Sequence, residues 1–352
     1  MTVVSQPLVS VLTPVHNGEQ YLRECIESVL AQTYANWDYT IVNNCSTDRT
    51  LEIAQQYAAR NPRIRIHNND VFVRVIENHN NAFRQISPAS KYCKVVAADD
   101  WLFPECLERM VRLAEEHPTV AIVGAYQIRG TGVASPGLPY PKTVTSGREI
   151  CRRQLLGGPY IFGAPTTVLF RSDIVRARDA FYNESNLHAD DEACLEFLEQ
   201  ADFGFVHQIL TYRRVQEGSM TSFSERFNTY VPGLLHLLVK FGPTYLTEDE
   251  RSTRIREVLR DYYRSLARSV FARRDAAFWQ YHRTKLTELG YPMSRARIAG
   301  AAISMIVDLL INPKVTLQKL KDRANHRAAD GHAALALDPP ASSGRPPAPL
   351  RG

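Results

Sequence analysis

The chain has 352 residues, of which 44% are hydrophobic and 22% charged, a composition typical of a soluble globular protein with a sizeable core. Its net charge of +5 is unevenly spread, because residues 251–327 carry 17 Lys and Arg against 6 Asp and Glu, which points to an anionic partner surface. Six cysteines without C-x-x-C spacing argue against a disulfide framework or a zinc site. They indicate reduced thiols in a cytoplasmic protein.

The first 125 residues alternate between apolar runs and segments of helical periodicity. The apolar runs predict five strands, at residues 9–13, 37–42, 64–66, 92–97 and 120–125. Between them, apolar residues recur every three or four positions, which predicts helices. Strands that alternate with helices form βαβ units with right-handed crossovers. The sequence therefore predicts an α/β fold with a Rossmann-like, mostly parallel open sheet.

Two adjacent carboxylates, Asp99 and Asp100, follow the fourth predicted strand. Ligands of such sheets bind outside the carboxyl ends of the strands, so both side chains are expected at the binding edge. Two neighbouring like charges raise each other's pKa unless a cation compensates, and carboxylate oxygens suit Mg²⁺ or Mn²⁺. The alternative is that the pair caps the helix that Pro104 introduces.

The first predicted strand-to-helix turn excludes two common nucleotide-binding classes. It reads Thr13-Pro14-Val15-His16-Asn17-Gly18, without the G-x-G-x-x-G of dinucleotide-binding proteins, and the chain has no G-x-x-x-x-G-K-S/T phosphate loop. Dehydrogenase and P-loop NTPase functions therefore lose their main support.

Four motifs in order along the chain resemble those of family 2 glycosyltransferases with the GT-A fold. They are Ser10–Gly18, Ser28–Tyr34, Asn43–Asp48 and Ala98–Trp101. The resemblance is strong over residues 8–125 and weaker to about residue 221. It implies a GT-A catalytic domain at 1–223, with a nucleotide-binding half at 8–125 and an acceptor half at 126–223.

The resemblance also implies a reaction and a set of site residues. The reaction is transfer of one sugar from a nucleotide-diphospho-sugar donor, with inversion at the anomeric carbon and with Mn²⁺ or Mg²⁺ as cofactor. Asp100 would bind the metal and Asp99 would approach the donor ribose or sugar. Thr13, Val15 and Asn44 would line the nucleoside pocket.

The sequence departs from the family pattern at two points. Asn43-Asn44 stands where the family usually has paired aspartates, and Ala97 stands where many members have the first Asp of D-x-D. An amide can accept from a uracil or thymine ring but can also donate, so a UDP- or dTDP-type donor is only the first expectation. Asp48 is expected to cap the helix predicted at residues 50–60.

The base expected to activate the acceptor lies in the stretch His188-Ala189-Asp190-Asp191-Glu192. A sugar hydroxyl that attacks the anomeric carbon needs a positioned carboxylate. Aligned on the family's E-D-x-D/E-L pattern, this stretch makes Asp190 the base and Asp191 the second candidate. The alternative is that these acids only favour the N-terminus of the following helix.

Two further segments are candidates for ligand contact. The small residues of Gly163–Thr167, ahead of a strand at 168–171, let a ligand approach the backbone closely, and the resemblance places the donor sugar or the acceptor there. Arg214 would contact the donor diphosphate, or else lie solvated on an edge strand after two short strands at 203–206 and 209–212. Residues 127–156 are expected to form loops.

The C-terminal part, residues 224–326, is expected to be a helical region, followed by a disordered tail at 327–352. Its apolar stretch at 298–311 is too short to span a membrane. Flanking basic residues suit a helix at the surface of an anionic membrane, and packing on the catalytic domain explains the apolar residues equally well.

The function expected from the sequence is sugar transfer to a glycan or lipid-linked acceptor, in surface polysaccharide synthesis at the inner face of the cell membrane. The absence of Q-x-x-R-W argues against a processive synthase, and a sugar-nucleotide pyrophosphorylase would show a Gly-rich basic first turn. The alternative to an enzyme is a catalytically silent module that binds a nucleotide-sugar or a glycan. No nucleic-acid-binding motif is present.

Overall fold

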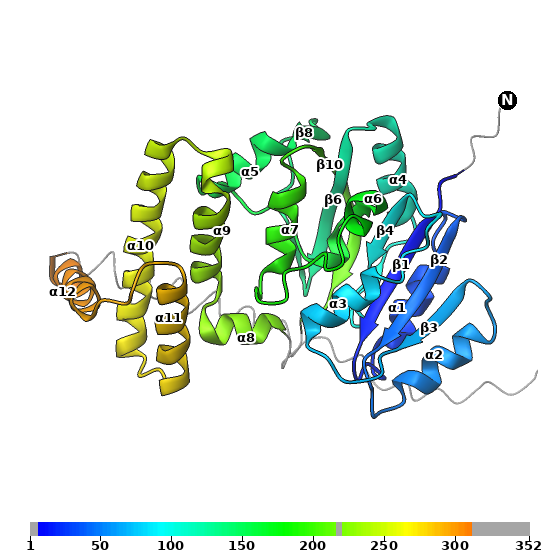
Figure 1. Ribbon diagram of the computed structural model, residues 1–352, viewed down its shortest axis with the longest axis horizontal. Helices are drawn as coiled ribbons and strands as arrows, with labels where there is room; N and C mark the ends of the chain where they lie inside the picture. The colour runs from blue at the N-terminus through cyan, green and yellow to red at the C-terminus, as the bar shows by residue number, and fades with distance from the viewer. Residues whose placement is uncertain (1–5, 216–219, 312–352) are drawn as a thin grey trace, which may run out of the picture. The chain divides into compact units, whose positions relative to one another are not determined.

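The computed structural model describes residues 6–215 and 220–311. The chain divides into two compact units, Met1–Ile298 and Ala299–Gly352. The first unit contains the sheet, its covering helices and most of the C-terminal helices (Figure 1). The boundary predicted at residue 223, between a catalytic domain and a helical region, stays a prediction. The tail predicted at residues 327–352 lies outside the described residues.

The first unit is organised around a mixed sheet in the order β3-β2-β1-β4-β9-β6-β10-β5, with β7 on β6 and β8 on β10. The strands are β1 (Val9–Val15), β2 (Trp37–Asn43), β3 (Ile64–Asn68), β4 (Tyr92–Val95), β5 (Trp101–Leu102), β6 (Val120–Arg129), β7 (Gly132–Ala134), β8 (Val144–Ser146), β9 (Leu169–Arg171) and β10 (Asp202–Arg213).

The helices are α1 (Leu22–Leu30), α2 (Thr50–Ala58), α3 (Val75–Phe83), α4 (Cys106–Glu116), α5 (Gly147–Leu155), the 3-10 turn η1 (Pro165–Thr167), α6 (Ser172–Arg176), α7 (Ala189–Phe197), α8 (Met220–Phe227), α9 (Tyr230–Tyr245), α10 (Glu248–Phe271), α11 (Ala276–Glu288) and α12 (Arg295–Ile311).

The mostly parallel sheet predicted from the sequence is confirmed for β1 to β4. β1 pairs in parallel with β2 and β4, and β2 pairs in parallel with β3. β1 is buried at all seven positions, because a parallel sheet is covered by helices on both faces. The second half is mixed: β6 and β10 are parallel, whereas β9 runs antiparallel to β4 and β6.

Two expectations about the second half were wrong, and one short strand was not predicted. Residues 127–156 contain the end of β6, the short strands β7 and β8 and helix α5, because pairing with neighbouring strands orders residues whose local composition favours loops. The two strands expected at 203–206 and 209–212 are one strand, β10, with register shifts between them. The two-residue β5 was not predicted, since its pairing with β10 is its only sheet contact.

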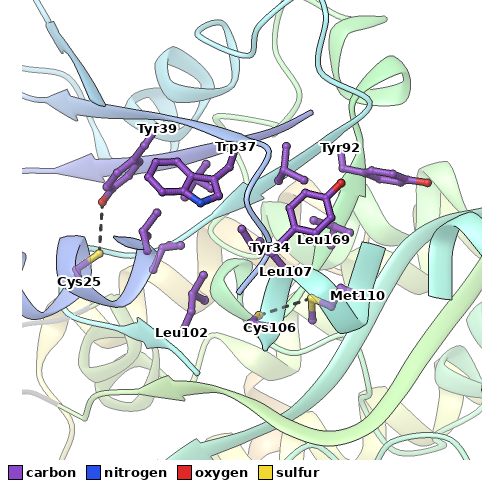
Figure 2. Packing of buried hydrophobic residues seen from close by; sticks show 14 of the residues in the cluster. Cys25, Tyr34, Trp37, Tyr39, Tyr92, Leu102, Cys106, Leu107, Met110 and Leu169 are labelled. Atoms are coloured by element: carbon purple, nitrogen blue, oxygen red, sulfur yellow. Dashed lines mark hydrogen bonds between the residues drawn. The ribbon is translucent and has the colours of Figure 1, made fainter. Parts of the chain in front are cut away.

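The core of the sheet joins β1, β2 and β4 to α1 and α4 (Figure 2). Trp37, Tyr39 and Tyr92 are almost fully buried there. The Tyr39 hydroxyl lies 2.8 Å from the Thr13 hydroxyl, so its polar end is satisfied inside the core. All six cysteines are free thiols, as the sequence predicted.

The C-terminal helices α9, α10 and α11 stand beside one another in Figure 1. Thr247 and Glu250 form a reciprocal capping box at the start of α10. Tyr262 of α10 and His282 of α11 are buried and lie 2.7 Å apart (hydroxyl to Nδ1), which joins these two helices. Within residues 6–215 and 220–311, no helix has both the length and the apolar character needed to cross a membrane.

Candidate functional site

The acidic pair lies at the carboxyl end of β4, in the turn that leads to β5. Asp100 is 4% exposed, and both of its carboxylate oxygens have partners. Oδ2 accepts a hydrogen bond of 2.6 Å from the Thr166 hydroxyl, and Oδ1 accepts one of 3.0 Å from the Arg214 amide. These contacts fix the carboxylate from two segments that are far away in the sequence.

The two carboxyl groups of the pair are protonated more readily than ordinary aspartates. Burial and the neighbouring Asp99 charge raise the pKa of Asp100 to about 7. Burial also raises the pKa of Asp99, and the charges of Arg214 and Arg213 oppose that shift. A cation bound at the pair would favour the ionised forms of both groups.

Thr166 connects the acidic pair to a segment that the sequence had marked for its small residues. Besides donating to Asp100, its hydroxyl accepts a hydrogen bond of 3.1 Å from the Ala97 amide. Three residues earlier, Gly163 has a φ of +77°, and a Cβ there would lie 2.2 Å from the Thr167 hydroxyl oxygen. A glycine is therefore required for η1 to place Thr166 under the pair.

A buried lysine lies below the same site. Lys94 of β4 is 0% exposed, and its ammonium donates to the Thr166 carbonyl and, at 3.0 Å, to the Val168 carbonyl. Burial lowers its pKa to about 8. Lys94 thus fixes the backbone of η1, whose Thr166 side chain positions Asp100.

The guanidinium of Arg214 has partners within the protein. Its Nε donates to the Asp99 carbonyl at 3.1 Å, and one Nη donates to Glu24 at 2.6 Å. The guanidinium also lies 4.0 Å above the Tyr21 ring. In this conformation Arg214 connects β10 to the acidic pair and to α1, and contact with a donor would require the Glu24 pair to open.

The three residues expected at the nucleoside pocket lie at the ends of β1 and β2. The Thr13 side chain is fully buried against Tyr39, so it does not reach the surface. Val15 is also buried, and its carbonyl accepts from the Asn44 amide at 2.8 Å. In this structure the side chains of Thr13 and Val15 are therefore enclosed by the protein.

The side chain of Asn44 is used entirely within the protein. Its oxygen accepts from the Val73 amide at 3.0 Å and from Asn69 at 3.0 Å, and its NH₂ donates to the Val73 carbonyl at 2.8 Å. Asn44 thereby holds the loop between β3 and α3 against the end of β2. The N-cap of α2 is Arg49 rather than the expected Asp48, which lies one residue earlier and accepts from the amide of Thr50, the first residue of the helix, at 3.0 Å.

The second acidic group begins α7, where Asp190 and Asp191 are half-buried. Burial raises the pKa of Asp190, while the neighbouring imidazoles of His188 and His79 oppose that shift. Burial and the Asp190 charge raise the pKa of Asp191 well above its ordinary value, with a hydrogen bond to Tyr160 opposing. Both carboxyl groups therefore hold a proton more readily than ordinary aspartates, and only Asp190 has neighbouring imidazoles that oppose the shift.

Glu192, the next residue, is the anchor of α7. It is 2% exposed and accepts hydrogen bonds from Asn183 and Asn186 of the preceding loop and from Lys240 of α9. Although burial alone would raise the pKa of Glu192, bonds from His236, Lys240 and the two asparagines hold it well below its ordinary range. The ion pair fixes the helix on which Asp190 lies.

Asn80 of α3 positions the approach to α7. Its side-chain oxygen accepts from the Tyr182 amide at 2.8 Å, and its NH₂ donates to the Tyr182 carbonyl at 2.9 Å. These two hydrogen bonds fix the backbone at Tyr182, which precedes Asp190 by eight residues. Tyr160 connects α7 to the segment that holds Thr166, because its hydroxyl donates to the Gly163 carbonyl at 2.7 Å and also has a hydrogen bond with Asp191.

Comparison with known proteins relates the chain to a family. Residues 10–178 match the sequence model described as Glycosyl transferase family 2. Over these residues the chain is similar to glycosyltransferase family 2. EpsE of Bacillus subtilis (strain 168), which carries the name of a glycosyltransferase, is 29% identical over 236 residues, which make up 64% of this chain and 78% of EpsE.

Solved glycosyltransferase structures share the fold. S. aureus TarS 1-349 in complex with UDP matches with a TM-score of 0.60 at 17% identity, over 84% of this chain and 88% of that one. The mannosyltransferase PcManGT from Pyrobaculum calidifontis, in complex with GDP-Man and Mn²⁺, matches with a TM-score of 0.52 at 13% identity, over 87% and 88%. The fold is therefore the GT-A fold, as the motifs predicted.

The residues of this site fit a divalent metal held by one or two carboxylates rather than one enclosed by protein ligands. Among the described residues, no group of three or more His, Cys, Asp or Glu side chains gathers in a way that could hold a metal. Mg²⁺ and Mn²⁺ in nucleotide sites usually take one or two carboxylates and complete their shell with water and phosphate. Asp100 retains lone pairs for this purpose, because each oxygen accepts only one of the hydrogen bonds described above.

Sequence reasoning missed the residues that position the site. Thr166, Lys94, Asn80 and Glu192 act through contacts with residues far away along the chain. One local signal was available: Lys94 is a charged residue in an otherwise apolar strand. Such a residue must find partners when the strand is buried.

Proposed function

We propose that this chain is a glycosyltransferase that moves one sugar from a nucleotide-diphospho-sugar to a glycan or lipid-linked acceptor, with inversion at the anomeric carbon. The observation that carries the proposal is the presence of two carboxylate sites of different chemistry, Asp99–Asp100 at the end of β4 and Asp190 at the start of α7. The first suits a cation and the second suits proton transfer.

In this mechanism Asp190 accepts the proton of the attacking acceptor hydroxyl. A base must be ionised to act, and the imidazoles of His188 and His79 favour that form of Asp190. Glu192 and Asn80 hold α7 and its approach in place, so the carboxylate does not need to be ordered during the reaction.

Asp100 is proposed to bind the metal, with Asp99 at the donor ribose or sugar. When bound, Mn²⁺ or Mg²⁺ would neutralise charge that develops on the leaving diphosphate. Thr166 and the Arg214 amide hold Asp100 in one orientation, and Lys94 secures Thr166. The end of β1 with Asn44 is proposed to support the nucleoside, through backbone atoms and the ordered loop.

Arg214 is proposed to contact the donor diphosphate after its present contact with Glu24 has opened. The arginine lies next to the acidic pair, but its guanidinium contacts Glu24 and Tyr21. Donor binding would have to exchange the Glu24 contact for a phosphate contact. Arginine can bind either partner through two parallel hydrogen bonds.

The proposal is tested by measuring nucleotide release from a panel of UDP-, dTDP- and GDP-sugars with and without Mn²⁺, with UDP- and dTDP-sugars as first candidates. Metal-dependent release of one nucleotide, together with inversion in the product formed on a supplied acceptor, is the expected result. Thermal stabilisation by a donor without any release or transfer would instead support a silent binding module.

A further inference from the structure

The C-terminal end of α10 presents two adjacent apolar side chains to solvent. Val270 is 47% exposed and Phe271 57% exposed. The buried face of α10 is formed by other residues, among them Tyr262, Tyr263 and Leu266, and α11 is anchored through Phe278. Val270 and Phe271 are therefore not part of the packing that holds the two helices together.

Arginines surround this apolar pair. Arg264 and Arg268 lie on the last turns of α10, and Arg273 and Arg274 follow in the turn itself; all four are exposed. In the part of the chain that the structure describes, none of the four forms an ion pair with a carboxylate. The nearby carboxylate of Asp275 is 3.0 Å from Arg226 of α8. The local positive charge is thus largely uncompensated.

Helix α8 extends the same surface. Arg226 joins α8 to the start of α11 through Asp275, and the Phe227 ring lies 5.7 Å from the Tyr281 ring. Phe223, one turn earlier on α8, is 39% exposed. We call Arg264, Arg268, Val270, Phe271, Arg273 and Arg274 the basic tip, and α8 lies beside it.

The basic tip faces the same side of the first unit as the candidate site. In Figure 1, β1 runs downward to its carboxyl end, α8 lies along the lower side, and α10 runs downward to its turn into α11. The site of such a sheet lies at the carboxyl ends of the strands, so the tip and the site are both toward the lower side of this view.

We propose that the basic tip docks the protein on an anionic lipid bilayer. Val270 and Phe271 would enter the boundary between headgroups and acyl chains, while the four arginines contact lipid phosphates. An extended nucleic acid fits this surface less well, because single-strand sites combine a basic groove with several stacking aromatics and the tip is a single protruding turn. This docking does not depend on the proposed transfer reaction.

The test is flotation of the full-length protein with phosphatidylcholine vesicles, with or without phosphatidylglycerol. The protein should float with the anionic vesicles and lose that binding as salt rises, since exposed charges are screened. Arg273→Gln/Arg274→Gln should lower the partition coefficient about thirtyfold, because each arginine near an anionic surface contributes about 1 kcal/mol. Val270→Ser/Phe271→Ser should lower it at least tenfold through the loss of apolar burial.

Matched variants control for overall charge and apolarity. Arg60→Gln/Arg153→Gln removes two exposed arginines elsewhere, and Val133→Ser/Ile209→Ser removes two exposed apolar side chains on the sheet. Both proteins should float like wild type. Equal flotation of tip variants and controls overturns the proposal.

Two other results also overturn it. In the first, the tip variants float fully but Ile303→Ser/Ile306→Ser, which changes two exposed residues of α12, does not. The other is tip-dependent binding of single-stranded RNA in a gel shift with no binding of vesicles. Circular dichroism of every variant establishes that the helices remain folded.

Discussion

Burial raises the pKa of both Asp100 and Asp190, but the two carboxyl groups have different neighbours. Asp100 is fixed by a hydroxyl and a backbone amide, with a second carboxylate beside it. Asp190 lies near two imidazoles and next to Asp191, whose pKa is raised well above its ordinary value. The first arrangement leaves negative charge for a ligand cation to neutralise, whereas the second keeps one carboxylate able to exchange a proton.

This comparison predicts that Asp190→Asn and Asp191→Asn differ strongly. Asp190→Asn should lower kcat by about 10³-fold, because general base catalysis commonly contributes 10²–10⁴-fold. Asp191→Asn should retain most of the turnover, since a protonated Asp191 resembles the amide that replaces it. Steady-state nucleotide release measures both. Full turnover of Asp190→Asn with loss in Asp191→Asn would move the base by one residue.

The position of α7, which carries Asp190, is predicted to depend on Glu192. Glu192→Gln should lower the free energy of unfolding by about 2 kcal/mol, because the buried Glu192 loses its charge while Lys240 and His236, 41% and 32% exposed, remain partly screened by solvent. Urea unfolding at pH 7 measures the change. Glu196→Gln, which removes an exposed pair with Arg178, should cost less than about 1 kcal/mol.

The pH dependence of the Glu192 effect has a definite sign. The pKa of Glu192 is lowered in the folded state, so its contribution is present above the ordinary value of 4.5 and is lost as pH falls through the folded pKa. The difference in stability between wild type and Glu192→Gln should therefore shrink under acid conditions. A difference that grows at low pH would contradict the assignment.

The orientation of the Asp100 carboxylate is predicted to depend on Thr166. Thr166→Val keeps the shape of the side chain but removes the hydrogen bond to Asp100. The Mn²⁺ concentration for half-maximal activity should rise about tenfold, the lower end of the effect of residues that orient metal ligands. Thr119→Val, which removes an exposed bond to Asp202, should leave it unchanged.

The smallest predicted effect is a displaced acid limb of the pH–rate profile. Because the pKa of Asp190 is raised, kcat/KM should begin to fall at a pH above the ordinary aspartate value of 3.8 as pH is lowered. The limb should keep its position in Asp191→Asn. A limb at the ordinary value, measured where circular dichroism shows folded protein, would contradict a buried base.

The sequence predicted the parts of this molecule that depend on local patterns. The strands β1, β2 and β4, the acidic pair after β4 and the acidic start of α7 all follow from periodicity and motif spacing. Thr166 and Asn80 could not be assigned in this way, since their partners lie 66 and 102 residues away. The same limit applies to Arg214, whose contact with Glu24 spans 190 residues.

Long-range assembly of Asp100 has a consequence for when the protein becomes competent during synthesis. The carboxylate is oriented by a hydroxyl from residue 166 and by the amide of residue 214. A nascent chain that has emerged only as far as β6 contains β1 to β4 and both aspartates but lacks these two donors. Ordering of the Asp100 carboxylate, the group proposed to bind the metal, is thus tied to completion of the sheet.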